Sequence, residues 1–161
     1  MPDTWNGQCF CGEVRYRMHG RPMFIHCCHC RDCQRQTGGA FAVNGLIEAD
    51  RIELLGGSPE PVRMATDSGH PHDIYRCTEC RSSLWSDYGG RNWLRFLRIV
   101  TLDTPDDFVP DVHIYTRSKL PWVVLPADAR AFEEYYDVRQ EWQVAGAARY
   151  RVAKEKAAAA R

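Results

Sequence analysis

The sequence lacks an excess of charge of either sign, because 21 lysine and arginine residues meet 21 aspartate and glutamate residues among 161. It also lacks a block of consecutive lysine and arginine residues. Proteins that bind nucleic acid or anionic membranes electrostatically generally carry such a surplus or a basic patch. We therefore expect neither nucleic acid nor a membrane as a partner.

Long apolar runs are also missing. No stretch approaches the roughly 20 apolar residues that a transmembrane helix needs. The segment from Met1 to Gly7 has no basic part followed by an apolar part, as a signal peptide would have. Together these absences predict a cytoplasmic protein.

Length and composition are those of one globular domain. Apolar residues make up 44% and charged residues 26% of the sequence, which is close to the usual values, and a chain of this length can bury one core. We place the domain at residues 1–126. Residues 127–161 are expected to form a helical tail, as part of the same domain or as a contact in a possible homodimer.

Alternation of apolar and polar residues predicts a mainly β fold of short antiparallel strands. The pattern is clear where Val14, Tyr16 and Met18 would share one face of a strand. Further β-like runs are separated by turn signals rich in Gly, Pro and Asp. These runs are residues 23–28, 40–47, 51–55, 61–65, 73–77, 83–88 and 93–102.

Two segments favour helix instead. Residues 31–36 are polar, contain no β-branched side chain and are followed by Gly38-Gly39, which is typical of a short helix. From Asp128 to Arg161, helix-forming residues predominate, with an interruption expected near Gly146. Residues 154–161 offer few large apolar side chains, so they are expected to fray or to pack on another subunit.

Cysteine, in contrast, is plentiful, with eight residues. In a reducing compartment their thiols are available to metal ions rather than to disulfides. Cys9 and Cys11 form one close pair, and Cys77 and Cys80 form another far along the chain. Residues two apart in an extended segment point to one side, and a C-x-x-C turn has the same effect. The four predict a closed, tetrahedral structural zinc site.

A second group, Cys28, Cys30 and Cys33, lies where a strand is predicted to change into a helix. Catalytic zinc sites characteristically have three protein ligands and an open fourth position. The group therefore predicts a second zinc ion, which is the candidate for catalysis. A second closed site remains an alternative. Its fourth ligand would come from His26, His29, His70, His72 or His113.

The eighth cysteine, Cys27, is expected to lie outside both groups. On a strand its side chain would point away from that of Cys28. A free cysteine also commonly serves as a small buried apolar residue. We therefore predict that Cys27 is not a ligand.

The residues around the cysteines resemble those of a known family. The matching segments are Gly7-Gln8-Cys9-Phe10-Cys11-Gly12-Glu13-Val14-Arg15-Tyr16, Cys28-His29-Cys30-Arg31-Asp32-Cys33, Thr37-Gly38, Ala40-Phe41, Cys77-Thr78-Glu79-Cys80 and residues 97–103 and 113–122. Over about residues 5–125 the chain resembles the glutathione-dependent formaldehyde-activating enzyme family, Gfa, which shares its domain with centromere protein V. Arg81 departs from the pattern, because the family usually has glycine there.

This resemblance implies the β-tent fold and two zinc ions, one structural and one catalytic. It implies that Cys9, Cys11, Cys77 and Cys80 hold the structural ion, and that Cys28, Cys30 and Cys33 hold the catalytic one. It further implies a carbon-sulfur lyase type of reaction, the reversible formation of S-(hydroxymethyl)glutathione from formaldehyde and glutathione.

The charge of the second site agrees with thiol chemistry. Three thiolates on Zn²⁺ leave a formal charge of about −1, which suits the site to holding an incoming thiol as a thiolate. The sequence leaves two alternatives open. One is a non-catalytic zinc-binding interaction module, and the other is the same chemistry on another thiol or aldehyde.

Overall fold

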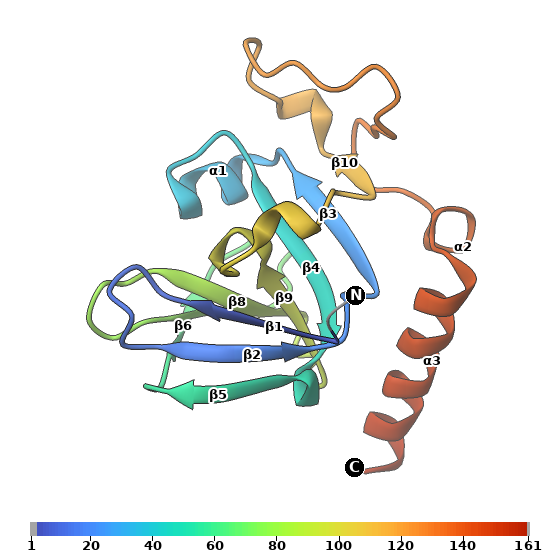
Figure 1. Cartoon of the computed structure of the whole chain (residues 1–161). Coiled ribbons are helices and arrows are strands. Elements are labelled where there is room, and N and C mark those ends of the chain that lie inside the picture. The colour runs from blue at the N-terminus through green and yellow to red at the C-terminus, as the bar shows by residue number, and fades with distance from the viewer. Residues whose placement is uncertain (1–2, 161) are drawn as a thin grey trace.

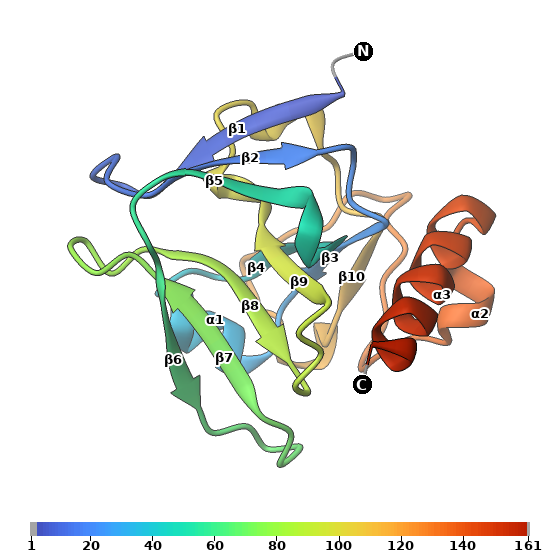
Figure 2. The same cartoon turned by 90° about the horizontal axis from the view of Figure 1, so that it is seen from below.

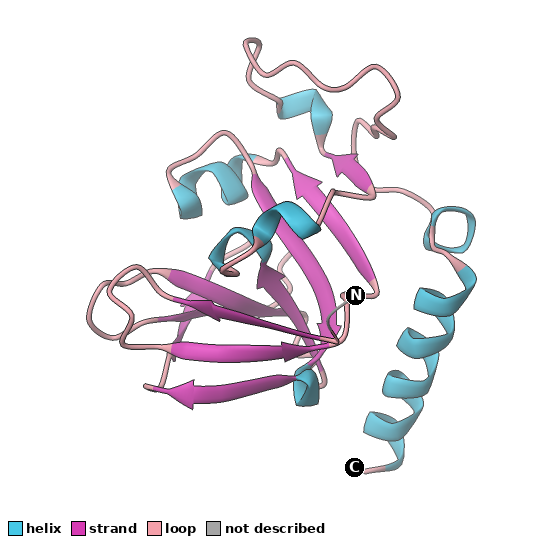
Figure 3. Ribbon diagram, in the orientation of Figure 1, coloured by secondary structure: helices cyan, strands magenta, loops and turns pink. Residues whose placement is uncertain are grey.

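The computed structural model describes residues 3–160, and its fold is mainly β, which confirms the predicted class (Figures 1 and 3). Met1, Pro2 and Arg161, at the ends of the predicted ranges, lie outside the described residues. The strands are β1 (Thr4–Gln8), β2 (Arg15–His19), β3 (Phe24–Cys28), β4 (Ala42–Glu48), β5 (Ile52–Gly56), β6 (Glu60–Met64), β7 (His72–Arg76), β8 (Ser83–Tyr88), β9 (Leu94–Arg98) and β10 (Val112–Ile114).

These strands form two sheets. The smaller has the order β1-β2-β5, and the larger has the order β10-β3-β4-β9-β8-β7-β6. Each pairing of neighbouring strands is antiparallel except that of β10 with β3, which is parallel. The sequence patterns did not predict β1 or β10. In the parallel pairing His113 lies opposite Cys27.

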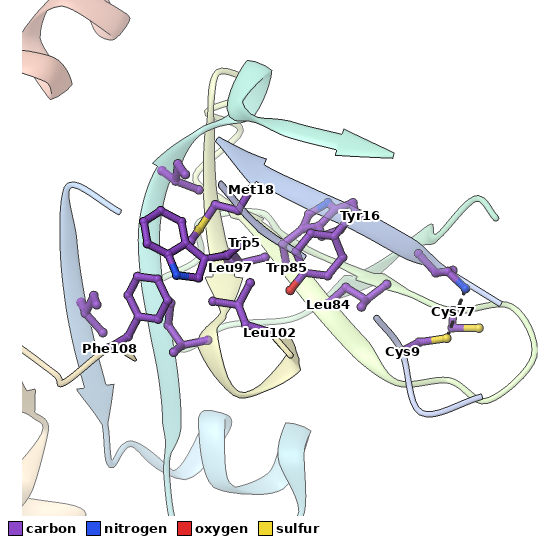
Figure 4. Packing of buried hydrophobic residues seen from close by; sticks show 14 residues of the cluster. Trp5, Cys9, Tyr16, Met18, Cys77, Leu84, Trp85, Leu97, Leu102 and Phe108 are labelled. Atoms are coloured by element: carbon purple, nitrogen blue, oxygen red, sulfur yellow. Dashed lines mark hydrogen bonds between the residues drawn. The ribbon is translucent and has the colours of Figure 1, made fainter. Parts of the chain in front are cut away.

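The main core lies between the two sheets (Figure 4). Val14, Tyr16 and Met18 are all fully buried there, as their alternation predicts. The ring of Tyr16 packs edge-on against Trp85 with a centroid distance of 5.6 Å, and its hydroxyl lies 2.7 Å from that of Thr101. The hydroxyl therefore keeps a hydrogen bond where an unpaired one would cost free energy.

A short helix, α1 (Arg31–Thr37), follows β3 and confirms the predicted helix. Its N-cap is Cys30, whose sulfur accepts a hydrogen bond from the backbone N–H of Cys33. Gly38 ends the helix in the left-handed conformation, with φ 67°, and its N–H donates to the Gln34 carbonyl at 2.8 Å. Both caps use standard helix-end chemistry.

The strand predicted over residues 93–102 is shorter than expected. β9 ends at Arg98, and a 3-10 helix (Ile99–Thr101) follows. The hydroxyl of Thr101 donates to the Arg98 carbonyl at 2.7 Å, so a side chain competes for the backbone group that would continue the strand. The other 3-10 helices are Ala49–Arg51, Pro105–Asp107 and Thr116–Ser118.

The C-terminal tail is helical only from Val138 onward, in α2 (Val138–Glu141) and α3 (Val144–Ala159). The prediction of helix from Asp128 is therefore wrong for residues 128–137. Their backbone instead bonds to β10 and the residues after it: the N–H of His113 donates to the Arg130 carbonyl at 2.8 Å, and that of Tyr115 donates to the Glu134 carbonyl at 2.9 Å. Tertiary pairing thus overrides local helix propensity.

Gly146 does not interrupt the tail, because it lies inside α3 and the break falls at residues 142–143. A Cβ atom at position 146 would lie 2.5 Å from the Met23 carbonyl oxygen, so glycine permits close packing there. Arg149 of α3 donates from Nε to Glu48 Oε1 at 3.0 Å and from Nη2 to Oε2 at 2.5 Å. These contacts hold α3 along the side of the molecule (Figure 2). No helix within residues 3–160 is long and apolar enough to cross a membrane.

Candidate metal centres

Four cysteines from two distant segments come together, and two of them, Cys9 and Cys77, lie at one end of the core (Figure 4). Cys9 and Cys11 follow β1, whereas Cys77 and Cys80 follow β7, and all four sulfur atoms lie within 4.8 Å of one another. The distance between the sulfurs of Cys9 and Cys11 is 3.5 Å, and that between Cys11 and Cys77 is 3.8 Å. Zinc–sulfur bonds of about 2.3 Å place two sulfurs of a tetrahedron about 3.8 Å apart. The group therefore has the donor set and spacing of a closed zinc site.

Local hydrogen bonds reach the sulfur atoms of two of these cysteines, Cys9 and Cys80. The backbone N–H of Val14 donates to the sulfur of Cys9 at 3.3 Å. The hydroxyl of Ser82 lies 3.1 Å from the sulfur of Cys80 and, as the largest cause, lowers the pKa of that thiol to about 5. A thiol that loses its proton easily is a better metal ligand, since the thiolate is the coordinating form.

Arg81, the residue that departs from the family pattern, has φ 62°. Glycine adopts this left-handed conformation without strain, whereas for a residue with a side chain the conformation costs about 1–2 kcal/mol. The turn nevertheless closes, because the N–H of Arg81 donates to the Cys77 carbonyl at 3.1 Å. The substitution leaves the four sulfurs together at the cost of local strain.

The second group, Cys28, Cys30 and Cys33, also comes together, with the three sulfurs within 4.8 Å of one another. Cys28 ends β3, Cys30 caps α1 and Cys33 lies in its first turn. Hydrogen bonds from Cys28 and then Cys33 lower the pKa of Cys30 to about 2, and the same contact raises the pKa of Cys28. Cys28 and Cys33 are buried and Cys30 is only partly so, which places the opening of the group beside Cys30.

No histidine or carboxylate among residues 3–160 completes this second group as a fourth ligand. His26 instead lies 2.5 Å from the Tyr136 hydroxyl, and His70 is exposed. His72 is buried beside the Tyr88 ring. His29 and His113 form a separate group with Cys27. Three donors with a free fourth position are therefore what the described chain supplies.

Arg98 is a site residue that the sequence patterns did not identify. It is 3% exposed and lies at the end of β9, with Nη2 donating to Gln36 Oε1 of α1 at 3.0 Å and Nη1 donating to Asn44 Oδ1. Burial lowers its pKa, and the negative charges of Cys33 and then Cys28 oppose that effect. An arginine in a predicted strand gives no sign of this role. The pairing of β9 with β4 sets Arg98 opposite Asn44, and there it feels the charges of the cysteines.

The comparisons with known proteins bear on the family of the chain. The sequence profile of the family described as glutathione-dependent formaldehyde-activating enzyme matches residues 4–118. No curated protein matches the chain. Among solved structures, that of a Rhodobacter sphaeroides protein is similar with a TM-score of 0.46 at 16% identity, covering 65% of this chain and 97% of that one. Because the family match spans most of the sequence and includes all eight cysteines, this chain belongs to the glutathione-dependent formaldehyde-activating enzyme family.

Proposed function

We propose that the protein is a carbon-sulfur lyase type of enzyme that interconverts S-(hydroxymethyl)glutathione with glutathione and formaldehyde. In the forward direction the glutathione sulfur bonds to the formaldehyde carbon while the C=O double bond becomes a single bond. The proton lost from the thiol ends on the new hydroxyl oxygen, so no oxidant or reductant is needed. The proposal rests on the family match together with the three converging thiols of Cys28, Cys30 and Cys33.

The observation that carries the proposal is that Cys28, Cys30 and Cys33 converge without a fourth ligand among the described residues. These residues would hold a catalytic zinc ion, and Cys9, Cys11, Cys77 and Cys80 would hold a structural one. A zinc ion at the three-cysteine group would supply an open position at which a substrate thiol is stabilised as the thiolate.

The surrounding residues suit such a site. Cys28 and Cys33 are buried in an apolar cluster with Leu46, Leu94 and Phe96, which keeps water from that side. The opening beside Cys30 is the side from which a thiol can approach. The buried guanidinium of Arg98 supplies a positive charge that offsets the formal charge of about −1 of three thiolates on Zn²⁺.

We also propose that the protein works in the cytoplasm. All eight cysteines are free, and thiol-based metal sites depend on a reducing environment. Glutathione is the thiol that the family description names, and it is abundant in that compartment as the main redox buffer.

The test is the exchange of formaldehyde with glutathione, followed by exchange NMR on the zinc-loaded protein. We expect the parent to accelerate exchange over the uncatalysed reaction and Cys30→Ser to lose most of that acceleration. Serine is a good N-cap, so this substitution removes a sulfur while preserving the start of α1. His70→Gln, at an exposed histidine away from both groups, serves as the matched control and should behave as the parent. A parent with zinc but no acceleration refutes the proposed substrates.

A further inference from the structure

A third group of metal-ligating side chains lies outside the two cysteine groups. It consists of Cys27, His29 and His113, whose donor atoms lie within 4.8 Å of one another. Nε2 of His29 is 3.6 Å from the sulfur of Cys27 and 3.0 Å from Nδ1 of His113. Cys27 and His29 are 2% and 0% exposed, while His113 is partly exposed. The group therefore has a buried interior and one side open to solvent.

The strand geometry separates this group from the three-cysteine group. Side chains alternate between the two faces along an extended chain, so Cys28 and Cys30 lie on one face and Cys27 and His29 on the other. The parallel pairing of β10 with β3 then sets His113 directly opposite Cys27. The third group is thus built from the same short run of sequence but on the opposite face of the larger sheet.

The backbone around the group is held in place. The N–H of His29 donates to the Ile114 carbonyl at 2.9 Å, and its carbonyl accepts from Gln34 Nε2 at 2.8 Å. The backbone of His113 bonds to Arg130 and Phe132 on its other side. The three donors are therefore positioned by secondary structure and by the returning tail, which is the preorganisation that a binding site needs.

Burial in the core does not by itself explain the polar contacts of His29. His26, a deeply buried histidine in β3, has the Tyr136 hydroxyl as its partner at 2.5 Å. For His29, the hydrogen-bond contacts of Nε2 are with Nδ1 of His113 at 3.0 Å and the sulfur of Cys27 at 3.6 Å, and Nδ1 has no hydrogen-bond partner within residues 3–160. A buried polar ring whose polar contacts are all potential metal ligands is better explained by a bound cation than by packing.

The distances agree with tetrahedral zinc. Bonds of about 2.05 Å to nitrogen and about 2.3 Å to sulfur place a sulfur and a nitrogen about 3.6 Å apart and two nitrogens about 3.4 Å apart. The observed separations are 3.6 Å and 3.0 Å, so a shift of a few tenths of an ångström in one ring suffices. We propose that Cys27, His29 and His113 form a third metal site, for a divalent cation of the zinc type.

The chemistry of this site would differ from that of the three-cysteine group. On binding, the Cys27 thiol releases its proton to solvent, and one thiolate with two neutral imidazoles leaves Zn²⁺ with a formal charge of about +1 rather than −1. Three protein ligands again leave a fourth position, on the side of the partly exposed His113. The site would bind an oxygen donor such as water or a carboxylate more readily than the thiolate-rich group does.

The experiment is cadmium-113 NMR with elemental analysis on the full chain loaded with cadmium. We expect three ions per chain and three resonances. The resonance of the third site should lie furthest upfield, because sulfur ligands deshield cadmium and this site has one sulfur. Cys27→Ala and His113→Gln should each remove that resonance and one ion while leaving the other two resonances in place.

His113→Gln removes a partly exposed side chain, so it tests the site even where Cys27→Ala disturbs the core. His70→Gln is the matched control and should keep all three resonances. Two ions and two resonances in the parent would overturn the proposal, as would three resonances that survive in both variants. Glutathione exchange plays no part in this readout, so the outcome is separate from that of the proposed function.

Discussion

Four consecutive residues, Cys27 to Cys30, divide their side chains between two faces of the larger sheet. The strand alternation that separates Cys27 from Cys28 is visible in the sequence, and the structure sets Cys27 apart from the three-cysteine group. The prediction that Cys27 is not a ligand differs from the proposed third site, in which Cys27 binds the metal. Alternation alone could not show what Cys27 meets on its own face. That depends on His113, which is 86 residues further along the chain and arrives through the parallel pairing of β10.

Arg98 gives the first prediction at the scale of single residues. Replacing it with methionine keeps much of the volume but removes a buried positive charge that interacts with the three-cysteine group. We expect zinc affinity at the three-cysteine group to fall about 10- to 100-fold, as is usual when a partner behind the ligands is lost. Competition with a chromophoric zinc chelator measures this affinity.

Arg98→Lys is the informative comparison, because it keeps the charge but loses the forked hydrogen bonds to Asn44 and Gln36. We expect it to retain more of the zinc affinity than Arg98→Met. Equal affinity in the parent and Arg98→Met would show that the charge of Arg98 does not stabilise the site.

Arg81 gives the second prediction at the scale of single residues. Its φ of 62° is strained for a residue with a side chain, so Arg81→Gly should raise the free energy of unfolding by about 0.5–1 kcal/mol after the extra flexibility of glycine in the unfolded chain is deducted. Glu79→Gly, in the same turn but without a positive φ, should lower it instead. Urea unfolding of the zinc-loaded proteins compares the two, and a loss of stability in Arg81→Gly would contradict the strain argument.

At the scale of elements, the sequence predicted the strands that have clear turn signals on both sides. For β3 to β8, the observed strand ends lie within two residues of the predicted ones. β10 could not be predicted, because it has three residues and owes its conformation to pairing with β3 and with the chain near Ala131. The prediction of helix over residues 128–137 is wrong for a similar reason. Amino-acid composition indicates helix propensity, but it does not show that a segment pairs with a distant strand.

Gly146 gives the prediction for α3. Alanine favours a helix over glycine by about 1 kcal/mol, so propensity alone predicts that Gly146→Ala stabilises the protein. The new Cβ would lie 2.5 Å from the carbonyl oxygen of Met23, however. Both atoms are attached directly to the backbone, so neither can move aside as the end of a flexible side chain could. We expect the clash to dominate and to lower the free energy of unfolding by about 1–3 kcal/mol.

Ala147→Gly provides the control, because position 147 is exposed and changes propensity without a new contact. It should lower stability by about 1 kcal/mol. Thermal unfolding measures both variants, and a Gly146→Ala protein that melts above the parent would show that α3 does not pack closely on the backbone of Met23.

At the scale of the whole molecule, the four-cysteine group joins the two sheets, since β1 belongs to the smaller sheet and β7 to the larger. Metal binding at such a site contributes directly to folding free energy. We therefore expect Cys77→Ser to lower the free energy of unfolding by more than about 3 kcal/mol, and Cys30→Ser to lower it by about 1 kcal/mol, because the three-cysteine group lies beside one helix end.

Calorimetry of the two variants after dialysis against the same zinc concentration compares them directly. Similar melting temperatures for Cys77→Ser and Cys30→Ser would show that the two groups do not divide structural and catalytic roles. The sequence predicted the membership of both groups from spacing, but not that one of them connects two sheets.

The central claim is that the group of Cys28, Cys30 and Cys33 has an open position for a substrate thiol, and its most direct test is a glutathione titration of the cobalt-loaded protein. Each thiolate bound to Co²⁺ contributes ligand-to-metal charge-transfer absorption in the near ultraviolet. The account predicts that glutathione increases this absorption by the share of one further thiolate in the parent and in Cys27→Ala, and not in Cys30→Ser. An unchanged spectrum in the parent, or an equal increase in Cys30→Ser, would contradict it.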